Sequence, residues 1–179
     1  MHPEIGEYDK YSVSIDFPNG YPKQFPRATE KSKKIPRITD RHVNKDNTLC
    51  LAVEPEEKLI CRNGITLKYF LDKVLVPHLS RETYRSLSGK YEDGEYSHGI
   101  VGLWEFFGDK LKTTDKKLIV NEFKIMLQSK RWPERNTPCL CGSKVKFKKC
   151  HLKKWKELAV LGDDYMRNIL AMLKSNLTS

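Results

Sequence analysis

The densest group of potential metal ligands lies near the carboxyl end of the chain. Three cysteines and a histidine fall within thirteen residues, namely Cys139, Cys141, Cys150 and His151. Thiolate sulfur and imidazole nitrogen are donors that tetrahedral zinc prefers, and four of them fill its coordination shell. Such a set leaves no open position for a substrate. The spacing therefore predicts a structural zinc site, the alternative being a group of unligated, reactive cysteines.

The segment around these residues is small. Gly142 permits a tight turn between the ligands, and so short a segment cannot bury a core of its own, so that bound metal would supply its folding energy. The sequence of residues 138–151 follows the pattern CxCGSxxKxKxCH and resembles the SEC-C motif, a small zinc module. This resemblance implies contacts with other proteins, in which the lysines would meet an acidic partner or nucleic acid.

A second group of reactive side chains lies between residues 40 and 51, where His42, Asn44 and Cys50 fall within nine residues. A thiol that follows a polar turn, and not an apolar run, is a candidate nucleophile. The Asn44 amide would hold an oxyanion or brace the loop. His42 would orient the loop or assist proton transfer from an attacking amine. The alternative is a structural turn that contains a buried cysteine.

The elements around this second group can be predicted from periodicity. Residues 11–17 alternate apolar and polar side chains, which predicts a half-buried strand. Three prolines between residues 18 and 26 exclude helix there, and residues 27–30 are candidates for an edge strand. Thr66 is the expected N-cap of a helix whose apolar positions repeat at helical spacing, and Pro77 is expected to kink or end it.

The remainder of the chain is predicted to be mainly helical. Helices are expected over residues 100–111, from about residue 114 onwards, and over residues 152–173. A linker rich in proline and polar residues spans residues 131–138. We therefore predict two domains, residues 1–130 and residues 131–179.

Several short motifs in residues 5–110 resemble the ubiquitin-conjugating (E2) family. That family has a strand, a proline-rich segment, an HPN turn and a catalytic Cys-Leu pair. In order, this chain has Phe17-Pro18, Tyr21-Pro22, Pro26, His42-Val43-Asn44 and Cys50-Leu51. The closer resemblance is to bacterial E2-like proteins, through the signature IPR…DRHVN.D…LCL and the later Tyr96, His98 and Gly99. Proteins of this kind are associated with cyclic-oligonucleotide antiphage defence (CBASS) and related conjugation systems.

The resemblance implies an α+β fold for residues 1–130, with the E2-like (UBC) antiparallel sheet and packed helices. The family's first helix and first strand would precede Tyr11 and are expected to be missing here. Two departures are Val43 in place of the HPN proline and a shorter Asn-to-Cys interval. The implied function is an E2-like transferase in which Cys50, with Asn44 and His42, carries the C-terminus of a protein partner as a thioester and transfers it to a lysine amine.

The implied partner is a cGAS-like nucleotidyltransferase or a ubiquitin-like protein, with or without an E1-like activating enzyme. The alternative is an inactive E2-like adaptor whose zinc module mediates protein or nucleic-acid contacts. The net charge of +10 is compatible with nucleic-acid binding, but no aromatic side chains interleave with the lysine runs, so that binding is not favoured.

The remaining observations concern location and the other histidines and cysteines. No apolar run is long enough for a membrane span, so no membrane association is expected. Five cysteines do not suit a secreted disulfide framework, and a cytoplasmic location is expected. His78 and Cys61 are interpreted as structural, and His98 as a structural or solvated loop residue.

Overall fold

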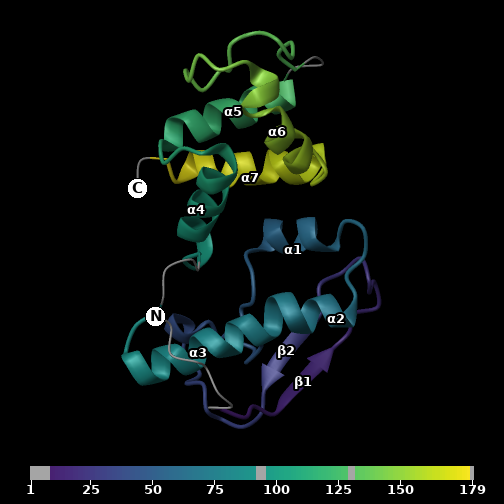
Figure 1. Ribbon diagram of the computed structural model, residues 1–179, viewed down its shortest axis with the longest axis vertical. Coiled ribbons are helices and arrows are strands. Elements are labelled where there is room, and N and C mark those ends of the chain that lie inside the picture. The colour runs from purple at the N-terminus through teal and green to yellow at the C-terminus, as the bar shows by residue number, and fades with distance from the viewer. Residues whose placement is uncertain (1–8, 92–95, 129–131, 178–179) are drawn as a thin grey trace. The chain divides into compact units, whose positions relative to one another are not determined.

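The computed structural model describes residues 9–91, 96–128 and 132–177. The chain forms two compact units, Met1–Glu95 and Tyr96–Ser179 (Figure 1). The predicted domain boundary, between residues 130 and 131, therefore lies inside the second unit. The helices that precede this boundary share a hydrophobic core with the helices that follow the Cys/His segment, which explains the difference.

The first unit contains a two-stranded antiparallel sheet. Strand β1 (Val13–Asp16) pairs with β2 (Arg27–Glu30) in a register that places Val13 opposite Glu30 and Asp16 opposite Arg27. Both strands lie where alternation and edge-strand composition predict them. The described residues thus form a mixed helical protein with one small sheet. The E2-like fold stays a prediction.

The core of the first unit lies between this sheet and the helices. Ala28 on β2 and Phe70 are fully buried, and Phe25 meets the Phe70 ring edge-on with centroids 5.5 Å apart. Val43 and Leu49, which flank the polar turn, are buried in the same cluster. Burial of these apolar side chains anchors the turn and so fixes the position of His42 and Cys50 beside it.

Helix α1 (Glu54–Cys61) was not among the helices predicted from the sequence. Its first turn has a proline, Pro55, and the acidic residues Glu54, Glu56 and Glu57. Proline at the start of a helix and negative charge at its N-terminus both favour helix formation. The signal was missed because the helix has only eight residues and buries few of them.

The long helical segment that follows has three parts, which are α2 (Leu67–Phe70), a π-helical turn η2 (Leu71–Leu75) and α3 (Val76–Ser88). Thr66 caps it as predicted, since its Oγ1 accepts a hydrogen bond from the Tyr69 amide at 3.1 Å. The Val76 amide donates to the Leu71 carbonyl, five residues earlier. The chain therefore stays helical through Pro77, which lies in the first turn of α3.

The second unit is helical, with α4 (Gly99–Leu111), α5 (Lys116–Gln128), η3 (Phe147–Lys149), α6 (Leu152–Ala159) and α7 (Asp163–Ser175). Helix α5 packs against both α4 and α7. The prediction of one helix over residues 152–173 was wrong. Gly162, with φ +86°, separates α6 from α7, and Asp163 and Asp164 begin the second helix.

The end of α4 is a tight turn that we expect to depend on Gly108. The Thr113 amide donates to the Gly108 carbonyl at 3.0 Å, and a Cβ at residue 108 would lie 2.8 Å from the Thr113 carbonyl oxygen. We expect Gly108→Ala to destabilise the second unit by about 1–3 kcal/mol, because the turn must shift to accept the methyl group.

Urea unfolding followed by tryptophan fluorescence measures this effect, since Trp104 lies on the same helix. Val101→Ala is the control, because Val101 is exposed on α4 and its truncation should change stability by less than about 0.5 kcal/mol. Equal stability of Gly108→Ala and the native protein would show that the turn has room for the methyl group.

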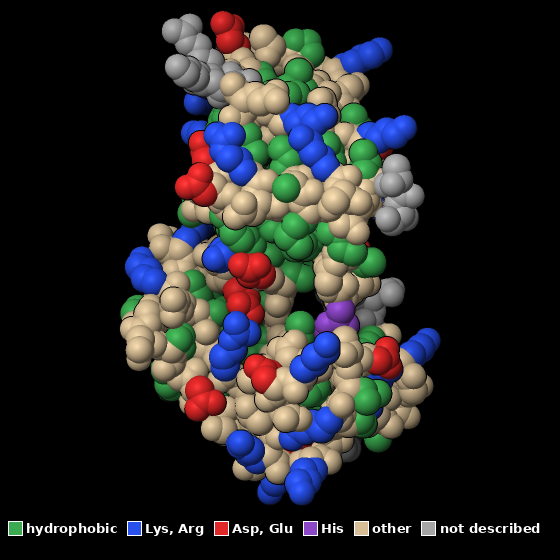
Figure 2. Space-filling model, turned by 180° about the vertical axis from the view of Figure 1, so that it is seen from behind, with side chains coloured by type: hydrophobic (Ala, Val, Ile, Leu, Met, Phe, Trp, Pro, Cys, Tyr) green, Lys and Arg blue, Asp and Glu red, His purple; other side chains and the backbone are tan. Residues whose placement is uncertain are grey.

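Two further observations concern the helix lengths and the surface charge. Among the described residues, no helix is both long and apolar enough to cross a membrane. On the face shown in Figure 2, described Lys and Arg side chains are spread among acidic and apolar ones and do not form a single band.

Candidate metal centre and candidate thiol site

The first two cysteines of the metal group lie on a short hairpin. Residues Pro138 and Lys146 form an antiparallel bridge, and the Cys139 amide donates to the Val145 carbonyl at 2.8 Å. The turn between them contains two left-handed residues, Gly142 with φ +79° and Lys144 with φ +59°. This tight return holds the Cys139 and Cys141 side chains close together.

The other two residues of the metal group come directly after η3. The amides of Cys150 and His151 both donate to the Phe147 carbonyl, each at 3.1 Å. Phe147 is fully buried and its ring lies edge-on to Trp155, with centroids 5.1 Å apart. Anchoring Phe147 in the core thus directs Cys150 and His151 back towards the hairpin.

Together these elements bring the four donor atoms into one cluster. One donor atom from each of Cys139, Cys141, Cys150 and His151 lies within 4.8 Å of the others. The Cys139 Sγ lies 3.1 Å from the His151 Nδ1, and the Cys141 Sγ lies 3.6 Å from the Cys150 Sγ. Three sulfurs and one nitrogen at these separations can hold a metal ion in a four-coordinate site.

His151 is oriented by a hydrogen bond on the far side of its ring. Its Nε2 lies 2.6 Å from the carbonyl oxygen of Leu111, the last residue of α4. A carbonyl only accepts hydrogen bonds, so Nε2 carries a proton and Nδ1 presents its lone pair to the sulfurs when the ring is neutral. A second partner of this kind is the usual means by which proteins orient a ligating imidazole.

The thiols differ in their acidity. Burial raises the pKa of Cys139 to about 12. Burial also acts to raise the pKa of Cys141, but hydrogen bonds from the side chain and amide of Ser143, together with those from Cys139 and Cys150, lower that pKa to about 7. Since each thiol must lose its proton to bind a metal, metal binding releases protons and metal affinity falls as the pH is lowered.

A buried polar pair lies beside the centre and was not predicted. The Trp155 Nε1 donates to Glu122 Oε2 at 2.7 Å, and the other carboxylate oxygen, Oε1, lies 3.9 Å from the His151 Nδ1. Glu122 lies on the apolar face of α5, between Ile119 and Met126, and is only 2% exposed. A glutamate on an otherwise apolar helix face was the signal available in the sequence.

The candidate thiol Cys50 lies at the base of a second small hairpin. Val43 and Leu49 form an antiparallel bridge, and the Cys50 amide donates to the His42 carbonyl at 2.7 Å. The Leu49 amide donates to the Ala28 carbonyl at 2.7 Å, which attaches the hairpin to β2. Cys50 is partly exposed, so it is not a fully buried core residue.

Asn44 braces the turn of this hairpin. Its side-chain Nδ2 donates to the Thr48 Oγ1 at 3.0 Å, and its backbone amide donates to the Thr48 carbonyl at 2.8 Å. Thr48 in turn donates through its hydroxyl and its amide to Asp46 Oδ1, at 2.6 and 3.0 Å. Of the two roles expected for the Asn44 amide, the structure shows it bracing the loop.

His42 has a left-handed backbone, with φ +49°, and its ring lies among other rings. The Tyr91 centroid lies 5.4 Å away and the His78 centroid 6.1 Å away, both edge-on. His78 is buried on α3, as expected of a structural histidine, and Cys61 is buried with a pKa raised by that burial. His98 lies in the second unit, immediately before α4.

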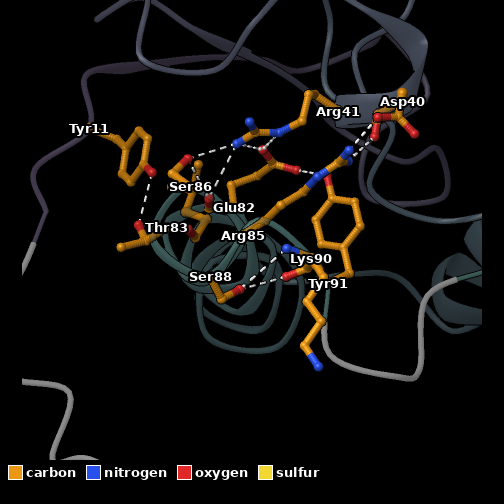
Figure 3. A network of polar contacts seen from close by, with 11 residues as sticks. Tyr11, Asp40, Arg41, Glu82, Thr83, Arg85, Ser86, Ser88, Lys90 and Tyr91 are labelled. Carbon is orange, nitrogen blue, oxygen red and sulfur yellow. Dashed lines mark hydrogen bonds and ion pairs between the residues drawn. The ribbon is translucent and has the colours of Figure 1, made fainter.

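A polar network holds the residues just before His42 against α3 (Figure 3). The fully buried carboxylate of Glu82 accepts a hydrogen bond from the Arg41 Nε at 2.8 Å and another from the Tyr91 hydroxyl. Arg41 also donates to Ser86 Oγ at 2.8 Å. Arg85 pairs with Asp40, and its guanidinium carbon lies 4.3 Å from the Tyr91 ring centroid.

The charges of this network shift the ionisation of its members. Burial, followed by the hydrogen bond to Glu82, raises the pKa of Tyr91 to about 12, so its hydroxyl stays protonated as a donor. The hydrogen bond from Arg85 lowers the pKa of Asp40. Sequence reasoning missed this network because its partners are 41 and 45 residues apart, although opposite charges at 40–41 and 82–85 offered a weak signal.

Comparison with known families agrees with the geometry of the Cys/His cluster. Residues 135–153 match the SEC-C motif. This motif binds zinc, and the four clustered side chains of the SEC-C motif are those that the sequence predicts as ligands. The match covers 19 of the 179 residues and describes this segment alone. A search of curated proteins and a search of solved structures found no match to the chain.

Proposed function

We propose that the protein is an E2-like acyl-transfer enzyme whose SEC-C motif holds a structural zinc ion. The observation that carries the enzymatic part is the hairpin of residues 42–50, which presents a partly exposed thiol beside His42 while its apolar residues are buried against β2. The resemblance of the motifs around Cys50 to the ubiquitin-conjugating family supplies the reaction type.

Zinc is the metal that fits the cluster best. Three thiolates and one imidazole suit its coordination preference, and the hydrogen bond from His151 to Leu111 presets the ligating nitrogen. With four protein ligands the ion would have no open position, so its role would be to hold the hairpin and η3 together. We infer no catalytic step at this centre.

The proposed reaction takes place at Cys50. Its thiolate attacks the carbonyl of an activated acyl donor, formed at the C-terminus of a ubiquitin-like protein or a cGAS-like nucleotidyltransferase, and the activating group leaves. A lysine amine then attacks the thioester carbonyl. The carbon–sulfur bond breaks, an amide bond forms, the Cys50 thiolate is regenerated, and the amine loses a proton to a base.

His42 is the candidate for that proton transfer, because the Cys50 amide and the His42 carbonyl hold the two residues together. Asn44 would act mainly on the hairpin, since its amide donates to Thr48. A stable hairpin matters for acyl transfer because misplacement of the nucleophile by a single ångström lowers the rate steeply.

The test is to trap the acyl adduct. The protein is expressed together with the products of its neighbouring genes and run on gels with and without dithiothreitol. We expect a higher-mass adduct that dithiothreitol removes, that Cys50→Ala abolishes, and that becomes resistant to dithiothreitol in Cys50→Ser, because an oxygen ester replaces the thioester.

Cys61→Ala is the matched control, since Cys61 is buried and should leave the adduct intact. Mass spectrometry of the trapped ester identifies the partner. Two results would contradict the proposal that Cys50 carries the acyl group. One is an adduct that persists in Cys50→Ala, and the other is the absence of an adduct with any of the neighbouring gene products.

A non-catalytic adaptor is the second candidate, and two observations favour it. Val43 stands where the family has proline and is buried in the core, and the Asn44 amide is already engaged within the hairpin. An adaptor would keep its biological activity in Cys50→Ala and lose it when a SEC-C ligand is replaced. The enzyme would lose activity in Cys50→Ala.

A further inference from the structure

The three thiols of the SEC-C cluster are not equivalent in their access to solvent. Cys139 is 6% exposed and its sulfur lies 3.1 Å from His151, which is itself only 2% exposed. Cys141 and Cys150 are both partly exposed. A soluble oxidant can therefore reach Cys141 and Cys150 before it reaches Cys139.

The two accessible sulfurs are also adjacent. The Cys141 Sγ lies 3.6 Å from the Cys150 Sγ, and the Ser143 Oγ lies 3.5 Å from the Cys150 Sγ. A disulfide requires the sulfurs to approach to about 2.05 Å. The turn between Cys141 and the end of the hairpin is exposed and contains Gly142, so the small closing movement is opposed by little packing.

We propose that Cys141 and Cys150 form a reversible disulfide under peroxide, and that this oxidation releases the metal from the SEC-C motif. The inference rests on the proposed zinc site and is independent of the proposed activity of Cys50. Cys141 and Cys150 would then have two roles. They would bind the structural metal when reduced, and they would form a disulfide when the oxidant concentration rises.

The chemistry balances with hydrogen peroxide as the two-electron oxidant. The Cys141 sulfur attacks one peroxide oxygen, the O–O bond breaks, and a sulfenic acid and one water result. The Cys150 sulfur then attacks the sulfenic sulfur, a sulfur–sulfur bond forms, and the hydroxyl leaves as a second water. Two thiols and one peroxide thus give one disulfide and two waters, and in the zinc-loaded protein, where both sulfurs are thiolates, solvent supplies the two protons.

The disulfide removes two of the four donors. Cys139 and His151 remain, and two donors do not satisfy the four-coordinate geometry of a structural zinc site. The metal would therefore leave the site. A thiol reductant restores both sulfurs and with them the site.

The experiment uses the full-length protein loaded with zinc, and its zinc content is measured first. Peroxide is added in steps, released zinc is read with a chromogenic chelator, and differential alkylation with peptide mapping locates each disulfide. We expect the Cys141–Cys150 disulfide and released zinc to rise together in equal amounts, and dithiothreitol to reverse both. Cys50→Ser, which removes the other partly exposed thiol, should give the same result.

Two results would overturn the inference. One is a first disulfide that contains Cys139 or Cys50, and the other is zinc that stays bound after the Cys141–Cys150 disulfide has formed. If the protein binds no zinc before oxidation, the proposed zinc site fails, while peptide mapping still decides whether the pair forms a disulfide. The two failures are therefore separable.

Discussion

Removal of zinc from the full-length protein is expected to unfold the SEC-C motif and to loosen α6 and the end of α4. The structural reason is that His151 connects the four-ligand cluster to the Leu111 carbonyl, while Trp155 connects α6 to Glu122. Structural zinc in small modules contributes on the order of 10 kcal/mol to the free energy of folding at neutral pH. The measurement is hydrogen exchange of the zinc-loaded protein before and after addition of a chelator.

The matched variants are Cys139→Ser, which removes a ligand, and Cys61→Ala, which removes a buried cysteine of the first unit. Cys139→Ser should lose bound zinc and show the exchange pattern of the chelated protein. Cys61→Ala should keep its zinc. If the backbone amides of residues 137–155 stay protected from hydrogen exchange after the chelator is added, the metal is dispensable for the fold of this segment.

The second large effect is expected at Arg41. Its Nη2 lies 2.7 Å from Glu82 Oε2, and the Glu82 side chain is fully buried. Arg41→Met would leave that carboxylate buried without its main cationic partner, and loss of one partner from a buried ion pair costs about 3–5 kcal/mol. We expect the first unit to lose stability by this amount.

The three tryptophans all lie in the second unit, so fluorescence does not report on this change. Hydrogen exchange of the α3 amides is the appropriate measurement. Lys68→Met is the control, because Lys68 pairs with Asp72 on the surface. Such surface pairs contribute less than about 1 kcal/mol to the free energy of unfolding. The double variant Arg41→Met with Glu82→Leu should be more stable than Arg41→Met alone, since no buried charge remains. A double variant that is less stable would contradict this account.

The parts of the molecule that could be predicted from the sequence are those determined by nearby residues. The SEC-C ligands lie within thirteen residues, so a turn and a single 3₁₀ helix are enough to bring them together. The Thr66 cap and strand β1 likewise depend on residues a few positions apart. Local side-chain chemistry and periodicity are sufficient for such features.

The features that escaped prediction depend on tertiary contacts. Leu111 and His151 are 40 residues apart, and Glu122 and Trp155 are 33 residues apart, so spacing alone gives no sign of either bond. The break at Gly162 was hidden because apolar residues keep a helical period on both sides of it. The compact units divide after Glu95 and not at the proline-rich linker for a related reason, since such a linker indicates a turn but not whether the helices around it share a core.

The π-helical turn between α2 and α3 has a consequence for how this chain tolerates changes in length. Such a turn holds one residue more than an α-helical turn, and each residue advances the helix by about 100°. Deletion of one residue between Leu71 and Leu75 would remove this extra residue and convert the turn into a regular α-helical turn, with little rotation of α3 relative to Phe70. Glu82 and Arg85 would then still face the segment that contains Arg41, whereas the same deletion in α3 ahead of Glu82 would turn them by about 100°. A one-residue deletion should therefore be tolerated better in the π-helical turn than in the first turns of α3.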